Sequence, residues 1–197
     1  MSRRLVLASG NAGKLAELGA LLAGSGFALV PQGALGIADA EETGHTFIEN
    51  ALLKARHASA ASGLPALADD SGLCVDALGG APGLYSARYA GAQGNAAANI
   101  ARLLGELATL PPPHRAHFHC AIVLLRHADD PAPIVCEGRW DGEILAAPRG
   151  DGGFGYDPVF LDPASGLTAA ELSPAEKHRA SHRGRALAQL LARLPEF

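Results

Sequence analysis

The chain alternates short apolar runs with segments of helical periodicity. Residues 5–8 form an apolar run, leucines at helical spacing follow up to Leu22, and FALVP then begins the next apolar run. Short strands that alternate with helices predict an α/β domain. Two longer apolar stretches, HFHCAIVLLRH and APIVCEGRWDGEIL, predict a hairpin that turns at ADDPA. We therefore expect one domain over residues 1–197, with a mixed twisted sheet flanked by helices.

The element limits follow from periodicity, caps and breaker residues. Helices are predicted at residues 14–23, 46–62, 96–110 and 182–194, and Thr46 with Glu49 has the spacing of a capping box. Residues 65–78, PALADDSGLCVDAL, are predicted as a strand, a polar break and a second strand. The glycine- and proline-rich residues 79–95 predict a loop or lid, and residues 148–161 predict a second glycine-rich loop that leads into a strand.

Composition excludes several functional classes. The 197 residues are 48% hydrophobic and 18% charged, as in an ordinary globular protein, and the formal net charge is -4. That charge gives no electrostatic reason to expect nucleic-acid or membrane-surface binding. The three cysteines form no C-x-x-C pair, which predicts buried free thiols in a reduced compartment. Without a visible signal peptide or membrane span, we expect a cytoplasmic protein.

The stretch SGNAGK has part of the chemistry of a phosphate-binding loop. It lies between a predicted strand and a predicted helix, and Lys14 adds a positive charge close to the helix N-terminus. The standard phosphate loop is incomplete, because Ala8 stands where it has a glycine and Leu15 where it has Ser or Thr. The residues therefore allow either a phosphate site or a plain turn with a surface lysine.

The stretch ADDSG supplies two adjacent carboxylates at the end of an apolar run. Carboxylates at a strand end are suitable ligands for Mg²⁺. Neighbouring residues on a strand point to opposite faces, so Asp69 and Asp70 are not expected to hold one ion in the same way. A partner carboxylate is expected from the acidic loop with Asp39, Glu41 and Glu42. The alternative is an Asx-type turn closed by residues 71–72.

Two further stretches combine features of ligand binding. GDGGFGYDP surrounds Phe154 and Tyr156 with glycines, so either ring could stack on a base, or both could pack into the core. AEKHRASHRGRAL concentrates basic residues, which form either a solvated face or a receptor for phosphate. On one helix, Arg179 would share a face with Arg183. His117 and His119 alternate as in a strand, and no third ligand supports a zinc site.

Seven segments, in this order, resemble the inosine triphosphate pyrophosphatase family, also called Ham1-like. They are SGNAGK, EETGHTFIENALLKARHA, ADDSGLCVDALGGAPGLYSARYAG, FHCAIVLLRH, GGFGYDPVF, AEL and SHRGRAL. The series is most similar to the bacterial dITP/XTP branch. The resemblance implies an elongated α/β fold with a nucleotide cleft between two lobes, and a homodimer. It also implies Mg²⁺-dependent hydrolysis of ITP, dITP and XTP to the monophosphate and pyrophosphate, which keeps these bases out of DNA and RNA.

The resemblance also implies roles for matching residues. Asp70 would be the catalytic base and a Mg²⁺ ligand, and the register against TGHTF favours Glu42 over Glu41 as the second ligand. The triphosphate would be held by Ser9, Gly10, Asn11, Ala12, Gly13 and Lys14. The rest of the nucleotide site would be lined by Ser71, Phe154, Gly155, Tyr156, Asp157, Lys177, His182 and Arg183.

Selectivity for inosine or xanthine requires recognition of the 6-oxo group, which adenine lacks. We expect His182, Arg183 and the backbone near residues 154–157 to make these contacts. Two other functions fit the same residues less well. A Maf-type pyrophosphatase would prefer pyrimidine or modified nucleotides, and a non-catalytic nucleotide-binding protein would bind ITP without turnover.

Overall fold

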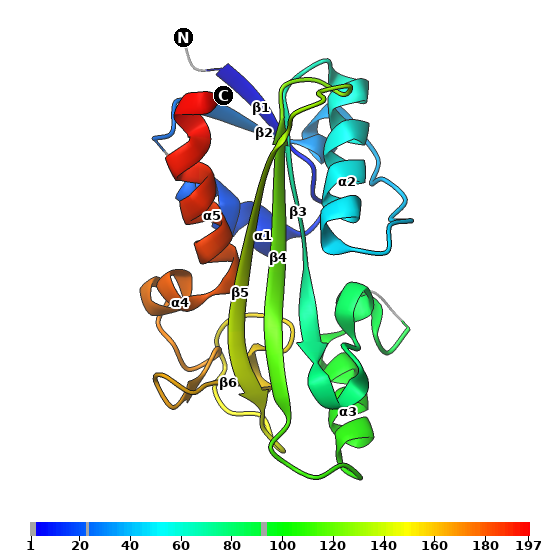
Figure 1. Cartoon of the computed structure of the whole chain (residues 1–197), viewed down its shortest axis with the longest axis vertical. Helices are drawn as coiled ribbons and strands as arrows, with labels where there is room; N and C mark the ends of the chain where they lie inside the picture. Colours follow the sequence, from blue (N-terminus) through cyan, green and yellow to red (C-terminus); the bar gives the residue numbers. More distant parts are fainter. Residues whose placement is uncertain (1–2, 23, 92–93) are drawn as a thin grey trace. The chain divides into compact units, whose positions relative to one another are not determined.

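The structure, a computed structural model, describes residues 3–22, 24–91 and 94–197. Seven strands form one sheet in the order β2-β1-β3-β4-β5-β6-β7. Figure 1 labels β1 to β6. The pairs β1–β2 and β1–β3 are parallel, whereas β5–β6 and β6–β7 are antiparallel. The predicted α/β class with a mixed sheet is therefore confirmed. Ala23, at the end of the first predicted helix, and residues 92–93 of the predicted loop lie outside the described residues.

The elements have the following bounds. The strands are β1 (Arg3–Leu7), β2 (Phe27–Pro31), β3 (Ala66–Val75), β4 (Arg115–Leu125), β5 (Ile134–Ile144), β6 (Phe160–Asp162) and β7 (Leu167–Thr168). The helices are α1 (Ala12–Leu21), α2 (Phe47–Ser62), α3 (Ala96–Leu107), α4 (Pro174–Ala180) and α5 (His182–Arg193), with the 3-10 segments η1 (Gln32–Leu35), η2 (Asp76–Leu78), η3 (Gly83–Arg88), η4 (Asp157–Val159) and η5 (Leu194–Glu196). No helix in the described part of the chain is long and apolar enough to span a membrane.

The ends of α2 follow local sequence signals. The Thr46 side chain accepts the N–H of Glu49 at 3.2 Å, and the Glu49 carboxylate accepts the N–H of His45 at 2.8 Å. Gly63 ends the helix in the left-handed conformation, which suits a residue without a Cβ atom. The predicted α2 is confirmed. Helix α1 begins two residues earlier than predicted, because Asn11 acts as its N-cap.

Two local predictions are wrong, whereas the predicted start of the last helix at residue 182 is confirmed. β3 runs unbroken through the two aspartates, so there is neither a polar break nor an Asx-type turn at residues 71–72. The predicted basic helix face is divided, because α4 ends at Ala180, the extended Ser181 follows, and α5 begins at His182. Arg179 and Arg183 therefore lie on different helices.

The chain forms two compact units, which are described separately. Unit 1 contains residues 1–70, 120–137 and 186–197, and unit 2 contains residues 71–119 and 138–185. Strands β3, β4 and β5 contribute residues to both units. Unit 1 has a hydrophobic cluster on each face of its strands, and unit 2 has a separate one.

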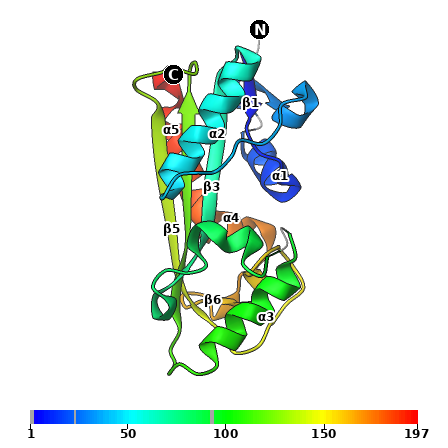
Figure 2. The same cartoon turned by 90° about the vertical axis from the view of Figure 1, so that its right-hand side faces the viewer.

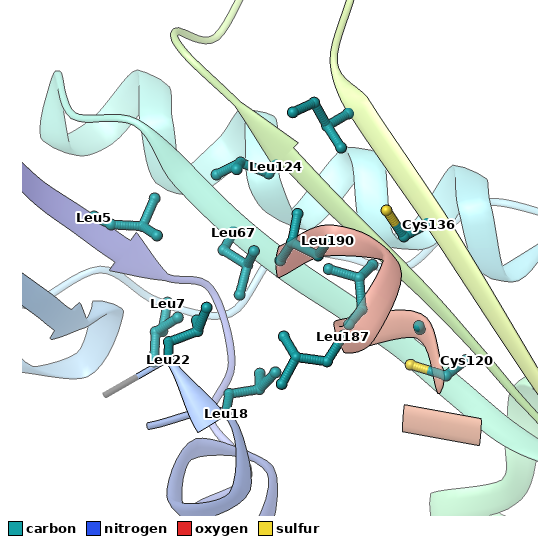
Figure 3. Packing of buried hydrophobic residues seen from close by; sticks show 13 residues of the cluster. Leu5, Leu7, Leu18, Leu22, Leu67, Cys120, Leu124, Cys136, Leu187 and Leu190 are labelled. Atoms are coloured by element: carbon teal, nitrogen blue, oxygen red, sulfur yellow. The ribbon is translucent and has the colours of Figure 1, made fainter. Parts of the chain in front are cut away.

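In unit 1, side chains of the strands alternate between two cores. Leu5, Leu7 and Leu67 point toward α1 and α5, where they pack with Leu18 and Leu187 (Figure 3). The intervening residues of the same strands point toward the alanines of α2, which lies in front of the strands in Figure 2. This period-two alternation places helices on both faces of the sheet.

In unit 2, one face of the strands carries the aromatic core. Phe118 of β4 packs against Trp140 of β5 and Phe160 of β6, with ring centroids 6.3 and 4.5 Å away. Leucines of α3 complete this core. The neighbours of Phe118 in β4 point to the other face of the strands. They are His117 and His119, which are half-buried, as expected for strand residues.

Candidate functional site

Strand β3, which lies between β1 and β4, sends two adjacent carboxylates to opposite faces of the sheet. Asp69 has the parity of Leu67 and therefore points toward α1, whereas Asp70 has the parity of Ala68 and points toward α2. Both are buried, with 1% and 7% of their surface exposed. The prediction that they lie at a strand end is wrong, because β3 continues to Val75. The prediction that they face opposite ways is confirmed.

Asp69 forms an ion pair with the lysine of the SGNAGK turn. Lys14 Nζ lies 3.0 Å from Asp69 Oδ2, and the Asp69 side chain has no exposed surface. The register between β1 and β3 pairs Leu7 with Leu67, after which the chain leaves β1 for α1. This connection brings Lys14 to Asp69, two residues further along β3.

Asp70 and Glu42 share one lysine that the sequence reasoning missed. Lys54 Nζ lies 2.9 Å from Asp70 Oδ1 and 2.8 Å from Glu42 Oε1. A signal was present in the sequence: Lys54 stands three residues after Ala51 and four before Ala58, on the buried face of α2. We call Lys14, Glu42, Lys54, Asp69 and Asp70 the β3 charge cluster, and all five belong to unit 1.

The two candidate glutamates differ in exposure and in their contact with the β3 charge cluster. Glu42 is half-buried and meets the lysine that binds Asp70, whereas Glu41 is exposed. Glu42 is therefore the glutamate that could share a cation with Asp70. Glu42 and Asp70 have oxygen donors, which suit a hard divalent cation.

Burial and ion pairing shift the protonation of this cluster. Burial raises the pKa of Asp70 above its ordinary value of 3.8, and the Lys54 ammonium opposes this effect only in part. Burial by itself would lower the pKa of Lys54, but the carboxylates of Asp70, Asp69 and Glu42 outweigh it and raise that pKa above 10.5. Lys54 therefore remains a cation at neutral pH, and Asp70 is a stronger base than an exposed aspartate.

The SGNAGK turn is held by its own side chains. The N–H of Lys14 donates to Asn11 Oδ1 at 3.1 Å, and the N–H of Asn11 donates to Ser9 Oγ at 3.2 Å. Gly10 lies close to the acidic loop, since a Cβ atom there would approach the Asp39 carboxylate to 2.8 Å. Ala12 and Gly13 form the first turn of α1, where backbone N–H groups have no carbonyl partner within the helix.

Unit 2 contains a second cluster, around the exposed ring of Phe154. The Asp157 carboxylate accepts the N–H of Phe154 at 2.7 Å and the Lys177 ammonium at 2.6 Å. Lys177 Nζ lies 4.7 Å from the centre of the Phe154 ring, and Arg183 Cζ lies 5.8 Å from it. Arg183 also donates to Ser71 Oγ at 3.0 Å. We call Ser71, Phe154, Asp157, Lys177 and Arg183 the Phe154 cluster.

Three predicted site residues in unit 2 contribute to core packing or to the backbone conformation of the loop. Tyr156 is 4% exposed in the aromatic core, and its hydroxyl donates to the Ser86 carbonyl at 2.9 Å. Its ring therefore packs in the core, whereas Phe154 remains 41% exposed. Gly155, between them, has φ 62°, which favours glycine. His182 is stacked on Phe118, with ring centroids 4.8 Å apart.

Ser86 and Asn99 organise the neighbouring backbone and were not predicted as site residues. Ser86 Oγ accepts the N–H of Leu73 in β3 at 2.9 Å. The buried Asn99 accepts the N–H of Ala90 at 2.7 Å and donates to the carbonyls of Ser86 and Ala87 at 3.3 Å. These bonds fix η3 next to β3 and Tyr156, and nothing local in the sequence identified them.

The mixed sheet and the two clusters define an α/β protein with buried lysine–carboxylate pairs on an inner strand of the sheet. More specifically, the chain belongs to the Ham1 family, whose family model matches residues 5–193.

Curated relatives and solved structures agree with this membership. A dITP/XTP pyrophosphatase of Xanthomonas axonopodis pv. citri is 64% identical over 98% of this chain and 97% of its own length. Another, from Ralstonia nicotianae, is 64% identical over 99% of this chain and 98% of its length. A HAM1 protein from Coxiella burnetii has a TM-score of 0.93 and 50% identity, covering 99% of this chain and 100% of that one. A Mycobacterium abscessus nucleoside-triphosphatase / dITP/XTP pyrophosphatase has a TM-score of 0.77 and 46% identity, with coverage of 95% and 98%.

Proposed function

We propose that the chain hydrolyses the non-canonical purine nucleoside triphosphates dITP, XTP and ITP to the monophosphate and pyrophosphate. Relatives that are 64% identical over nearly the full length carry the name dITP/XTP pyrophosphatase. The observation that carries the proposal is the β3 charge cluster, where Asp70 is buried beside Glu42 and a shared lysine. Such hydrolysis removes these nucleotides before they are incorporated into DNA or RNA.

Residues of this chain supply the catalytic base, the positive charge that faces the phosphate oxygens, and the turn that binds the triphosphate. Asp70 accepts the proton of the attacking water, a role that its burial favours. Lys14 and Lys54 stabilise negative charge on the phosphate oxygens. The triphosphate binds at the turn of residues 9–14, where the first-turn N–H groups of α1 also favour an anion.

Mg²⁺ is the cation that we propose for Glu42 and Asp70. Their carboxylates converge on one ammonium group, so this place already stabilises a cation. Within the described ranges no group of three or more His, Cys, Asp or Glu could hold a metal ion, and the proposal uses these two carboxylates alone. Mg²⁺ commonly has one or two carboxylate ligands and completes its shell with phosphates and water. When bound, the ion supplies positive charge to the phosphate oxygens.

The Phe154 cluster is our candidate for the site that binds the purine base of the substrate. The exposed Phe154 ring offers a stacking surface, and Arg183 offers donors to an oxygen such as the 6-oxo group. Asp157 accepts the Phe154 N–H and the Lys177 ammonium on the same oxygen, Oδ2, so we assign it to holding this loop. Tyr156 and His182 support the cluster from the core. Homodimerisation, which the resemblance implies, remains a prediction for sedimentation analysis.

A triphosphate panel tests the proposed function. Purified protein with Mg²⁺ is incubated with ITP, dITP, XTP, GTP, ATP, dTTP and UTP, and pyrophosphate and orthophosphate are measured separately. We expect pyrophosphate from ITP, dITP and XTP, and a loss of roughly 10²- to 10⁴-fold in kcat for Asp70→Asn. Asp141→Asn, which removes an exposed carboxylate, should keep the activity.

Three outcomes would contradict the proposal. Orthophosphate as the sole product would show that the enzyme cleaves a different phosphoanhydride bond from the one proposed. Faster turnover of dTTP or UTP than of ITP would favour a Maf-type enzyme. Binding of ITP without any turnover would favour a non-catalytic nucleotide-binding protein.

A further inference from the structure

Asp69 is a buried carboxylate of the β3 charge cluster to which the proposed function gives no role. It has no exposed side-chain surface, and it lies 3.0 Å from Lys14 Nζ. It points to the opposite face of β3 from Asp70, although its charge still contributes to raising the pKa of Lys54.

The position of Lys14 is unfavourable for folding. It is the third residue of α1, and a cation near a helix N-terminus meets the positive end of the helix dipole. Its side chain is 15% exposed, so the ammonium has also lost most of its hydration. A buried ion pair is often no more stabilising than an apolar pair of similar volume. Stability therefore does not explain why a lysine and an aspartate occupy this place.

Neighbouring residues hold both the backbone and the side-chain ammonium group of Lys14. At the backbone, Asn11 Oδ1 accepts its N–H at 3.1 Å and sets the start of α1. At the tip, Asp69 holds the ammonium group. A lysine side chain has four rotatable bonds, and a partner at the tip removes most of their freedom before a ligand binds.

We infer that Asp69 is a positioning residue that holds the Lys14 ammonium ready for the triphosphate. This inference rests on the proposed function. An ammonium group has three donors, so Lys14 keeps its bond to Asp69 while it donates to phosphate oxygens. Preorganisation of this kind improves affinity because the side chain is ordered in advance. Asp69 does not itself contact the substrate.

If Asp69 positions Lys14, the removal of Asp69 should change the affinity for phosphate in the direction opposite to that expected from charge alone. If Asp69 were only a negative charge near the phosphate site, its removal would reduce repulsion and tighten phosphate binding. If Asp69 positions Lys14, its removal weakens binding, although the net charge has become more favourable to an anion.

The test is a double-mutant cycle with a non-hydrolysed probe. Inorganic tripolyphosphate is titrated calorimetrically into the full-length wild type, Asp69→Asn, Lys14→Gln and the double variant. Asn keeps the shape of Asp, and Gln keeps a donor for Asp69, so both single variants are expected to fold. Asp129→Asn, an exposed carboxylate of unit 1, controls for the loss of one negative charge. Steady-state hydrolysis of ITP is measured on the same samples.

We expect Asp69→Asn to weaken tripolyphosphate binding about tenfold in the wild-type background and by less than twofold in the Lys14→Gln background. Asp129→Asn should leave binding within twofold of wild type. Unchanged or tighter binding by Asp69→Asn would overturn the inference, and so would equal losses in both backgrounds, since Asp69 would then act independently of Lys14. Wild type that binds tripolyphosphate but releases no pyrophosphate from ITP would overturn the proposed function and leave this inference intact.

Discussion

At the scale of single residues, the Phe154 loop depends on one glycine. Gly153 has φ 72°, and a Cβ atom there would approach Asp157 Oδ2 to 2.1 Å. Asp157 can hold both the Phe154 N–H and Lys177 only because this space is empty. The glycine therefore supports the loop through close approach as well as through its backbone conformation.

We expect Gly153→Ala to displace the Asp157 carboxylate and to lower kcat/KM for ITP by roughly 10- to 100-fold, as a misplaced binding group does. Gly166→Ala is the matched control, since Gly166 has the same φ of 72° with no heavy atom within 4 Å of a built Cβ. Each variant should lose about 1–2 kcal/mol of unfolding free energy from left-handed strain. Pyrophosphate release and urea denaturation measure the two effects. Equal losses of activity would show that strain alone, and not the Asp157 contact, matters.

At the scale of elements, the β4–β5 hairpin is closed by one buried aspartate. Asp130 is 1% exposed and accepts the N–H groups of Arg126 and Ala132, each at 3.0 Å. Its bonds to the Arg126 guanidinium hold the pKa of Asp130 well below 3.8. The predicted turn at ADDPA thus contains the carboxylate that fixes it.

Because the folded-state pKa of Asp130 is lowered, its stabilising contribution is complete above 3.8 and is lost as the pH falls toward the folded-state value. We expect Asp130→Asn to lower the unfolding free energy at pH 7 by about 1–2 kcal/mol, chiefly through the backbone N–H groups, since Arg126 is half exposed and screened. The difference from wild type should shrink in urea denaturation below pH 3.8. Asp141→Asn, from an exposed Arg–Asp pair, should change stability by less than about 0.5 kcal/mol. A difference that stays constant with pH would contradict this account.

The elements that the sequence predicted well have local causes. The cap and the terminal glycine of α2 lie within its own segment, and so do the apolar runs of β4 and β5. The continuity of β3 could not be predicted locally. Two adjacent buried aspartates are tolerated only because Lys14 and Lys54 neutralise them, and those lysines are 55 and 16 residues away along the chain from Asp69 and Asp70.

The division of the basic segment also depends on a contact that periodicity does not reveal. Ser181 Oγ accepts the N–H of Gly184 at 3.1 Å, and a Cβ atom at Gly184 would approach the His178 carbonyl oxygen to 1.7 Å. The chain therefore turns sharply between α4 and α5. At the site, motif resemblance named Asp70 and Arg183, whereas Lys54, Ser86 and Asn99 required the three-dimensional structure.

At the scale of the whole molecule, the two units have separate hydrophobic clusters, yet three strands contribute to both units. Leu187 belongs to the core of unit 1, and the single tryptophan, Trp140, belongs to the core of unit 2. Because β3, β4 and β5 continue through both units, we expect the two cores to unfold in one cooperative transition.

Leu187→Ala should lower the unfolding free energy by about 2–5 kcal/mol, because it removes a fully buried side chain. The midpoint reported by Trp140 fluorescence should fall together with the midpoint reported by far-UV circular dichroism. Leu191→Ala, one turn later on α5 and 40% exposed, is the matched control and should change stability by less than about 0.5 kcal/mol. An unchanged Trp140 midpoint in Leu187→Ala would mean that the units unfold independently.

Because side chains alternate along β3, the number of residues before each aspartate determines the face of the sheet to which its carboxylate points. Each carboxylate meets its own lysine because Asp69 and Asp70 occupy odd and even places counted from Leu67. Inserting or deleting one residue between Leu67 and Asp69 would present each carboxylate to the wrong helix, although every residue of the motif would still be there. The spacing within this strand therefore determines which lysine each carboxylate meets.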